Sequence, residues 1–279
     1  MSNLQPPFTE ITPEGSSVPP PVPPSVLTVT LAVSTMGARA EAVRLPAERA
    51  GVDHLILVQA APVADLAKHY ATRRDVRVVI LDTLGLSKSR NAALAQATGD
   101  LIVFCDDDLG LDLDGIMALA KAFEQDGDLA LAAGWRSRGS GAQMAGRRGR
   151  TERLTLFNSG RICAPELMVR RTAFGPNGVR FDTDFGLGAR HGLGEEYVFV
   201  TDAFKAGLKG MSLPIITGQH DDISTGSDWD DPALMRGRQQ VLSRVFGPWA
   251  WMIRPVYAWR HRRRLGSMRA VFGFALNRL

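Results

Sequence analysis

Three consecutive aspartates, Asp106, Asp107 and Asp108, directly follow an apolar run at residues 101–105. Adjacent carboxylates repel one another, and burying them together without a cation would cost several kcal/mol. A divalent cation prefers oxygen ligands and is often completed by substrate phosphates. The triplet therefore indicates a site for Mn²⁺ or Mg²⁺. The alternative is that Asp107 or Asp108 caps a following helix.

Charged residues also occur at two predicted helix starts. At residues 85–91, Lys88 and Arg90 could add positive charge to backbone N–H groups that bind a diphosphate. At residues 194–197, Glu195 or Glu196 could act as a general base that takes a proton from a hydroxyl. The structural alternatives are a solvated, capped helix start for the first segment and carboxylates that complement the helix dipole for the second.

A single histidine, His220, follows a predicted short strand at residues 215–218. Neutral imidazole can complete an oxygen-rich metal site. A lone histidine is more often a hydrogen-bonded structural residue, so both interpretations stay open.

The elements that must position these residues alternate between strand and helix. Continuously apolar runs without polar alternation are typical of parallel strands covered on both faces. The sequence therefore predicts an α/β fold, with a doubly wound, mostly parallel sheet flanked by helices and functional groups at the carboxyl ends of the strands. The predicted strands are residues 26–35, 54–59, 76–81, 101–105, 129–134 and 215–218, and the predicted helices are residues 39–50, 64–71, 86–97 and 195–206.

Composition divides the chain into three parts. Residues 1–25 hold eight of the 16 prolines, which predicts a disordered lead-in that does not pair into a sheet. Residues 26–232 form the predicted catalytic domain, in which the Gly-, Ser- and Arg-rich residues 136–153 form a loop. Residues 233–279 form a basic extension.

The basic extension contrasts with the rest of the chain. Residues 236–279 contain ten arginines and no acidic side chain, whereas the other 23 basic residues face 29 acidic ones, a net charge of −6. Four of the five tryptophans follow Asp228. Aromatic rings beside arginines suit an anionic membrane surface. Packing on the catalytic domain and binding of nucleic acid are the alternatives, and we expect no nucleic acid.

The cysteine count and hydropathy also constrain localisation. Two cysteines cannot build a disulfide framework, and no apolar run approaches the roughly 20 residues that cross a bilayer. No secretory signal is recognisable at the N-terminus. We expect a cytoplasmic protein, with peripheral contact to the cytoplasmic face of the membrane if the tail binds lipid.

Taken together, these motifs resemble the inverting glycosyltransferases of family 2, which have the GT-A fold. The resemblance runs from about Val29 to Gly226 and is carried by residues 85–108, 181–189 and 194–207 together with His220. It implies a metal-dependent transferase that moves a sugar from a nucleoside-diphosphate sugar to a hydroxyl acceptor. The acceptor would be a glycan or a lipid-linked glycan, in the synthesis of polysaccharide or another envelope glycan.

The resemblance also implies roles by position. Asp106 would contact the ribose or the metal, Asp108 would be the main metal ligand, and His220 would match a third ligand. Glu196 would be the catalytic base, with Glu195 beside it. The implied donor-binding residues are Asp106, Asp107, Arg90 and Lys88, with Thr35 and Asp82 as weaker substitutes.

Two features depart from the family pattern. Residues 59–62 read Gln-Ala-Ala-Pro where acidic residues and Gly or Ser usually hold the nucleobase, and Glu196 stands where aspartate is common. Two other functions are compatible with the general fold. A sugar-nucleotide pyrophosphorylase would need a Gly-rich loop after the first strand, where residues 34–43 hold one glycine. A catalytically inactive, membrane-associated scaffold would not need Asp106, Asp108 and Glu196.

Overall fold

A computed structural model describes residues 8–11, 27–60, 66–108, 110–137, 150–175, 178–219 and 228–278. One mixed sheet with the order β1-β4-β3-β2-β5-β9-β7-β10-β6 forms the centre, and β8 pairs with β10 beside this path. The strands are β1 (Phe8–Ile11), β2 (Val29–Met36), β3 (Val52–Gln59), β4 (Val76–Leu81), β5 (Leu101–Asp106), β6 (Gly110–Leu111), β7 (Leu129–Ser137), β8 (Glu152–Arg153), β9 (Leu167–Arg170) and β10 (Lys209–Gln219).

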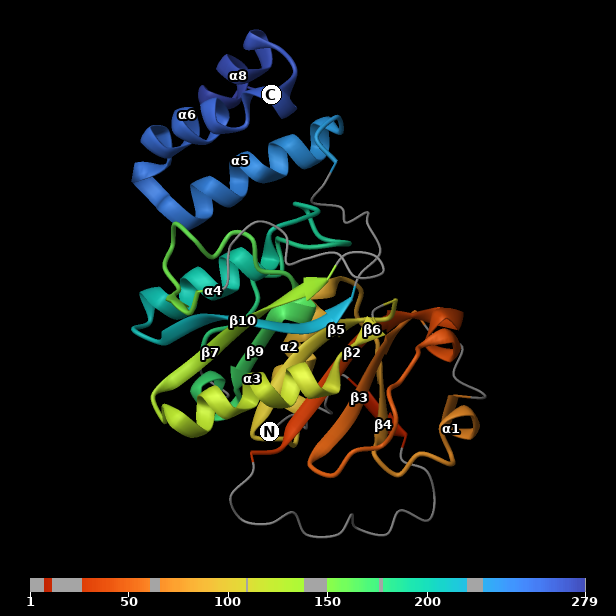
Figure 1. Cartoon of the computed structure of the whole chain (residues 1–279). Coiled ribbons are helices and arrows are strands. Elements are labelled where there is room, and N and C mark those ends of the chain that lie inside the picture. Colours follow the sequence, from red (N-terminus) through yellow and green to blue (C-terminus); the bar gives the residue numbers. More distant parts are fainter. Residues whose placement is uncertain are drawn as a thin grey trace, which may run out of the picture.

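Helices cover both faces of this sheet and continue into a C-terminal group (Figure 1). The α-helices are α1 (Leu66–His69), α2 (Leu86–Gln96), α3 (Leu113–Gln125), α4 (Glu195–Lys205), α5 (Pro232–Phe246), α6 (Ala250–Arg260), α7 (Arg262–Leu265) and α8 (Met268–Ala275). Short 3₁₀ helices occupy Gly37–Ala42, Ala164–Glu166, Arg171–Phe174 and Gly247–Trp249.

The first half of the sheet is parallel, as the sequence predicts. Strands β4, β3, β2 and β5 run in one direction, whereas β9 runs antiparallel between β5 and β7. In the register, Ser34 of β2 lies opposite Asp106 of β5. The carboxyl ends of β2 and β5 therefore coincide, which brings the residue after each strand to one edge of the sheet.

Burial on both faces explains the continuous apolar runs. On one face, Ile102 and Phe104 of β5 pack in a cluster with Ala93 of α2 and Phe199 of α4. On the other face, Val103 packs with residues of α3 such as Ile116. Successive side chains of a strand point to opposite faces, so a strand buried on both sides must be apolar at every position.

Two predictions about local structure are wrong. Residues 39–50 form no long helix, because the 3₁₀ helix Gly37–Ala42 is followed by irregular backbone. This irregular segment includes Pro46. Proline lacks a backbone N–H, and it disfavours the helical conformation of the residue before it, Leu45. Phe8–Ile11 pairs antiparallel with β4, although residues 1–25 were expected to stay outside the sheet. These four residues contain no proline, so their backbone N–H groups remain available for pairing.

The basic extension folds as helices α5 to α8. In Figure 1, this group lies beyond the carboxyl ends of the strands, with α5 between the sheet domain and helices α6 and α8. Val241 and Val245 of α5 pack with Phe185 and with Val198 of α4. The extension is therefore attached to the same segments that carry the predicted catalytic carboxylates.

Candidate active site

Arg90 is the centre of a cluster of charged side chains from three elements. It comes from α2, and its Nη1 lies 2.9 Å from Glu195 Oε1 and 3.1 Å from Glu196 Oε1, both at the start of α4. Its Nη2 lies 3.4 Å from Oδ1 of Asp106, the last residue of β5. The structure thus brings together four of the residues that the sequence singled out, although α2 and α4 are about 100 residues apart in the chain.

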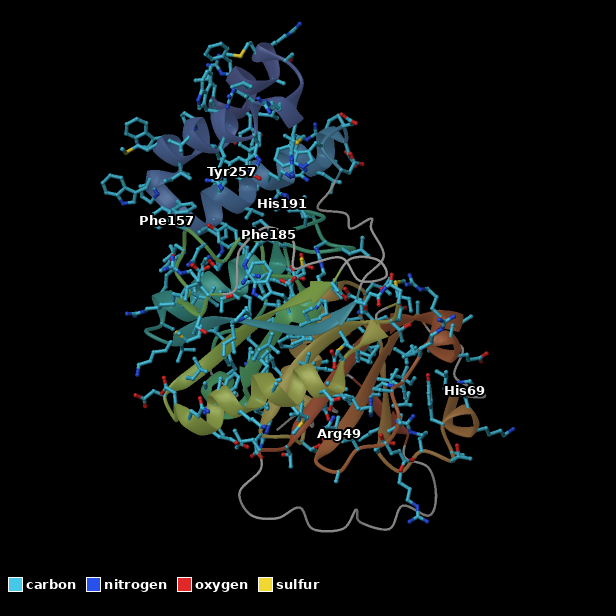
Figure 2. All side chains as sticks on the ribbon, viewed as in Figure 1. Arg49, His69, Phe157, Phe185, His191 and Tyr257 are labelled. Atoms are coloured by element: carbon cyan, nitrogen blue, oxygen red, sulfur yellow. The ribbon has the colours of Figure 1, made fainter. Side chains whose placement is uncertain are left out.

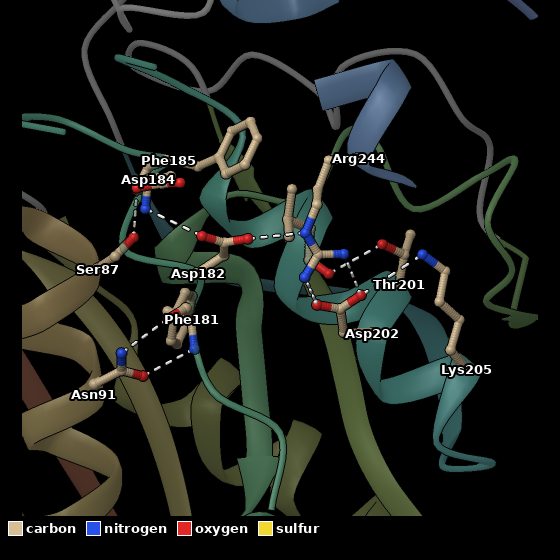
Figure 3. Close-up of polar contacts among 11 residues, drawn as sticks. Ser87, Asn91, Phe181, Asp182, Asp184, Phe185, Thr201, Asp202, Lys205 and Arg244 are labelled. Carbon is tan, nitrogen blue, oxygen red and sulfur yellow. Dashed lines mark hydrogen bonds and ion pairs between the residues drawn. The ribbon is translucent and has the colours of Figure 1, made fainter. Parts of the chain in front are cut away.

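Side chains of α2 bind the backbone of the loop at residues 181–191 (Figure 3). The Asn91 side chain donates to the Phe181 carbonyl at 2.9 Å and accepts from the Phe181 N–H at 2.8 Å. Ser87 Oγ donates to the Phe185 carbonyl at 2.6 Å. These hydrogen bonds from side chains of α2 to backbone groups of the loop hold the loop against the helix that carries Arg90.

Arg244 links the same loop to α4 and α5, as Figure 3 also shows. Its guanidinium, on α5, donates to Asp182 at 2.8 Å and to both carboxylate oxygens of Asp202 on α4, at 3.0 and 2.7 Å. A two-oxygen contact of this kind fixes orientation as well as distance. Helix α4 is therefore held near its start by Arg90 and in its last part, at Asp202, by Arg244.

Burial and mutual repulsion perturb the ionisation of the clustered carboxylates. Burial, followed by the charge of Glu195, raises the pKa of Glu196 to about 7, while Arg90 opposes this shift. Burial also raises the pKa of Asp106 against the effect of Arg90. Burial alone would lower the pKa of Arg90, but Glu196, Glu195 and Asp106 raise it overall, so the guanidinium stays charged.

The three aspartates have different surroundings. Asp107 accepts a hydrogen bond from Thr35 Oγ1 at 2.7 Å and is paired with Arg39. Asp108 is exposed and borders an open cavity of about 640 Å³. The other side chains around this cavity include Arg39, Arg44, Leu45, Pro46 and Gln219.

The helix-cap interpretation of the triplet is wrong. The following helix, α3, begins at Leu113, and its N-cap is Asp112, whose side chain accepts from the Gly115 N–H at 3.0 Å. Asp107 and Asp108 precede this cap by several residues. Capping therefore does not account for them.

The aspartate triplet offers carboxylate oxygens but, within the described residues, no complete set of metal ligands. Asp106 keeps 37% of its side chain exposed, Asp108 is exposed, and the only cation within ion-pair distance of Asp106 among the described residues is Arg90 at 3.4 Å. Asp107 and Asp108, but not Asp106, line the open cavity, and carboxylate oxygens are the ligand type that Mg²⁺ or Mn²⁺ prefers. Within the described part of the chain no group of three or more His, Cys, Asp or Glu side chains could hold a metal, and His220 lies outside that part.

The remaining predicted donor-binding residues form no ion pair or hydrogen bond with Arg90 among the described contacts. Lys88 and Asp82 are exposed, whereas Thr35 is buried beneath Asp107. At the start of α2, the Leu86 N–H donates to the Leu187 carbonyl at 2.9 Å. This N–H is therefore not open to a phosphate, and Arg90 contacts carboxylates from a buried position.

Sequence reasoning missed a second charged group beside the cluster. Buried Glu166 lies 3.5 Å from Nη1 of Arg161 and 3.9 Å from Nε of Arg136, and burial raises the pKa of Glu166 despite both arginines. Arg161 lies over the Trp135 ring at 3.8 Å. The position of Arg136 near the carboxyl end of a strand was the available signal, but the basic composition of residues 136–153 suggested a loop instead.

Comparisons with solved structures agree with this architecture. TarS residues 1–349 from S. aureus, in complex with UDP-GlcNAc, superpose with a TM-score of 0.56 at 14% identity, over 79% of this chain and 67% of that chain. The mannosyltransferase PcManGT from Pyrobaculum calidifontis, in complex with GDP-Man and Mn²⁺, superposes with a TM-score of 0.56 at 14% identity, over 92% and 81%. A mycobacterial protein gives a TM-score of 0.51 at 15% identity, over 79% and 74%. The fold is therefore the GT-A fold of glycosyltransferases.

One stretch of the sequence also matches a family model. Residues 59–175 match the model described as Glycosyl transferase family 2, a range that contains Arg90, Asp106 and Asp108. No curated protein matches the sequence. The resemblance to glycosyltransferase family 2 is confirmed over this range, and Glu195 and Glu196 follow it in the chain.

Proposed function

We propose that the chain transfers a sugar from a nucleoside-diphosphate sugar to a hydroxyl acceptor, with inversion at the anomeric carbon. The observation that carries this proposal is the convergence on Arg90 of Asp106, from a strand end, with Glu195 and Glu196, from a helix start. A transferase of this kind needs a base and a cation site close to the reacting sugar, and the proximity of these carboxylates to one another supports the proposal.

The donor class is supported by the similar structures. One was solved with UDP-GlcNAc and another with GDP-Man and Mn²⁺. Both ligands are nucleoside-diphosphate sugars, so we assign that class to this chain. The proposed acceptor is a hydroxyl of a polysaccharide or another envelope glycan.

Glu196 is the better candidate for the base. Glu195 is held by a 2.9 Å hydrogen bond from Arg90 and keeps 7% of its side chain exposed, against 15% for Glu196. A general base works best when its pKa lies near the operating pH, and burial raises the pKa of Glu196 to about 7. Glu195 would position Arg90, and Arg90 would hold both carboxylates in place.

Asp106 and Asp108 would hold a divalent cation, with His220 as a further ligand. When bound, this cation supplies positive charge against the donor diphosphate. Asp107 would help to position the cation ligands, because its hydrogen bond with Thr35 fixes the backbone between Asp106 and Asp108.

The transfer itself is one displacement. The acceptor hydroxyl gives its proton to a Glu196 carboxylate oxygen while the hydroxyl oxygen forms a bond to the anomeric carbon. The bond from that carbon to the diphosphate oxygen breaks on the opposite face, and the nucleoside diphosphate leaves with the bonding electron pair. Attack from the face opposite the leaving group inverts the configuration.

Release of nucleoside diphosphate from a panel of nucleotide sugars, with and without Mn²⁺ or Mg²⁺, tests this proposal. We expect Asp108→Asn to lower metal-dependent turnover by at least about 100-fold, because a charge interaction worth several kcal/mol is lost. Asp112→Asn is the matched control, since asparagine caps a helix as well as aspartate does. This control should keep activity within about twofold.

Other results would exclude the proposal. Turnover by Asp108→Asn equal to that of the unchanged chain would remove the cation role. Failure of every nucleotide sugar to raise the melting temperature would favour an inactive scaffold, because a ligand that binds only the native state must stabilise it. Formation of nucleotide sugar from a sugar phosphate would indicate a pyrophosphorylase.

A further inference from the structure

Helices α6 and α8 each expose an apolar stripe. On α6 the stripe consists of Met252, Val256 and Trp259, and on α8 and its C-cap residue it consists of Met268, Phe272 and Leu276, with exposed fractions between 47% and 68%. Spacings of four, seven and eight residues place each set on one face of its helix. Surface helices of globular proteins usually present charged or polar residues there.

These stripes are not an incomplete core, because the inner faces of the same helices are already packed. Ala258 of α6 and Phe274 of α8 are fully buried in a cluster with Met235 and Leu242 of α5. Tyr257 stacks on Phe274 with ring centroids 5.4 Å apart and lies within the helical group (Figure 2). The exposed apolar side chains are therefore additional to those that hold the helices together.

Exposed tryptophans and arginines occur on the same helices as the stripes and in the segments next to them. Trp249 and Trp251 are 66% and 64% exposed just before and within α6. The guanidinium of Arg262 lies 4.8 Å from the centre of the Trp259 ring. Other exposed arginines of this surface are Arg260, Arg263, Arg264 and Arg269.

We propose that this surface, formed by α6, α7 and α8, docks on an anionic lipid bilayer. Indole rings are favoured at the headgroup level, apolar side chains enter the acyl boundary, and arginines pair with lipid phosphates. The absence of any acidic side chain in residues 236–279 matches this charge. No helix among the described residues is long and apolar enough to span a bilayer, so the helices would lie along the surface.

A second copy of the chain fits this surface less well. A two-fold contact would bring the same arginines of both copies together, and like charges at an interface are unfavourable. Nucleic acid also fits less well, because Met252, Val256 and Leu276 offer neither charge nor a stacking ring. An anionic membrane is the occupant that uses both the apolar and the basic components.

Flotation of the full chain with vesicles tests the proposal. Vesicles of phosphatidylcholine with phosphatidylglycerol should bind the chain much more strongly than vesicles of phosphatidylcholine alone, and added salt should weaken the binding. Replacing three exposed arginines, R260Q/R263Q/R269Q, should lower the partition coefficient by about 100-fold, at roughly fivefold for each basic residue. The matched control K68Q/R74Q/K121Q removes the same charge from exposed positions of the sheet domain and should bind as the unchanged chain does.

A second variant separates the apolar contribution. W251S/W259S should reduce binding to anionic vesicles and should leave the melting temperature nearly unchanged, because both side chains are mostly exposed. Equal binding to neutral and anionic vesicles, or equal loss in the control triple variant, would overturn the proposal. So would a dimer in solution that W251S/W259S dissociates, or preference for single-stranded nucleic acid over vesicles.

The vesicle measurement is independent of the proposed transferase activity. Asp108→Asn should float with anionic vesicles as the unchanged chain does, since Asp108 lies in the sheet domain. Loss of turnover with retained flotation would therefore leave the lipid proposal intact.

Discussion

Arg90 is a buried cation, 1% exposed, whose neighbours are three carboxylates from distant parts of the chain. Its guanidinium is planar and always charged, so it can face several carboxylates at once. This role differs from the sequence-based expectation, which placed Arg90 near donor phosphates. Helical periodicity could not reveal the difference, because it places Arg90 on a face of α2 without showing what packs on that face.

Replacing Arg90 should destabilise the protein strongly. Arg90→Gln leaves Glu195 and Glu196 buried without their cation, and breaking a buried ion pair from one side typically costs about 3 to 5 kcal/mol. Chemical denaturation would measure the change in free energy of unfolding. Lys88→Gln, at an exposed position on the same helix, should change it by less than about 0.5 kcal/mol. Equal values for both variants would contradict the central position of Arg90.

The proposed base also makes a prediction about pH. Glu196 accepts a proton only when it is ionised, and burial raises its pKa to about 7. The ionised fraction therefore increases as pH rises through about 7, and kcat/KM should increase with it and then level off. Initial rates from roughly pH 5 to 9, with a stability check at each pH, would measure this. A rate that is flat across this range, or that falls as pH rises through 7, would exclude Glu196 as the base.

At the scale of elements, the start of α4 depends on one glycine. Gly194 is the N-cap residue, with φ of +91°, a conformation that side chains disfavour. A Cβ there would lie 2.4 Å from Val241 Cγ2 on α5. The close approach of α5 to α4 is therefore possible only without a side chain at residue 194.

Gly194→Ala should cost more stability than Gly207→Ala. Gly207 also has positive φ, +84°, but a Cβ there would meet nothing within 4 Å. Both variants pay backbone strain of about 1 to 2 kcal/mol, and Gly194→Ala adds about 1 to 3 kcal/mol for the clash. Thermal and chemical unfolding would compare the two. Similar losses at both positions would show that α5 moves away easily.

The predicted elements differ in how well the sequence located them. Strands β4 and β5 and helix α4 agree within one residue, because each is a long apolar or helical run that ends at charged residues or glycine. The prediction of a helix at residues 39–50 was wrong, because it took no account of Pro46 inside that range. The bounds of strand β9 could not be located from the sequence. Its four residues carry little periodicity, and its antiparallel pairing depends on distant partners.

At the scale of the whole molecule, charge and apolar surface are distributed unequally. The acidic part of the chain carries the carboxylate cluster, whereas residues 236–279, which contain most of helix α5 and helices α6 to α8, carry ten arginines. Arg244 pairs with both Asp182 and Asp202, so the basic helices are anchored on acidic residues of the sheet domain. The exposed aromatic and basic surface then lies on the helices farther from the sheet.

The sequence by itself determined the α/β class, the aspartates after a buried strand and the acidic helix start, because each is a local pattern of burial and charge. Only the tertiary structure decided that Arg90 joins Asp106 to Glu195 and Glu196, that Asp112 rather than Asp107 or Asp108 caps α3, and that α6 and α8 are apolar outside as well as inside. These features depend on contacts between segments far apart in the chain, and a local pattern contains no information on which distant side chain fills a given space.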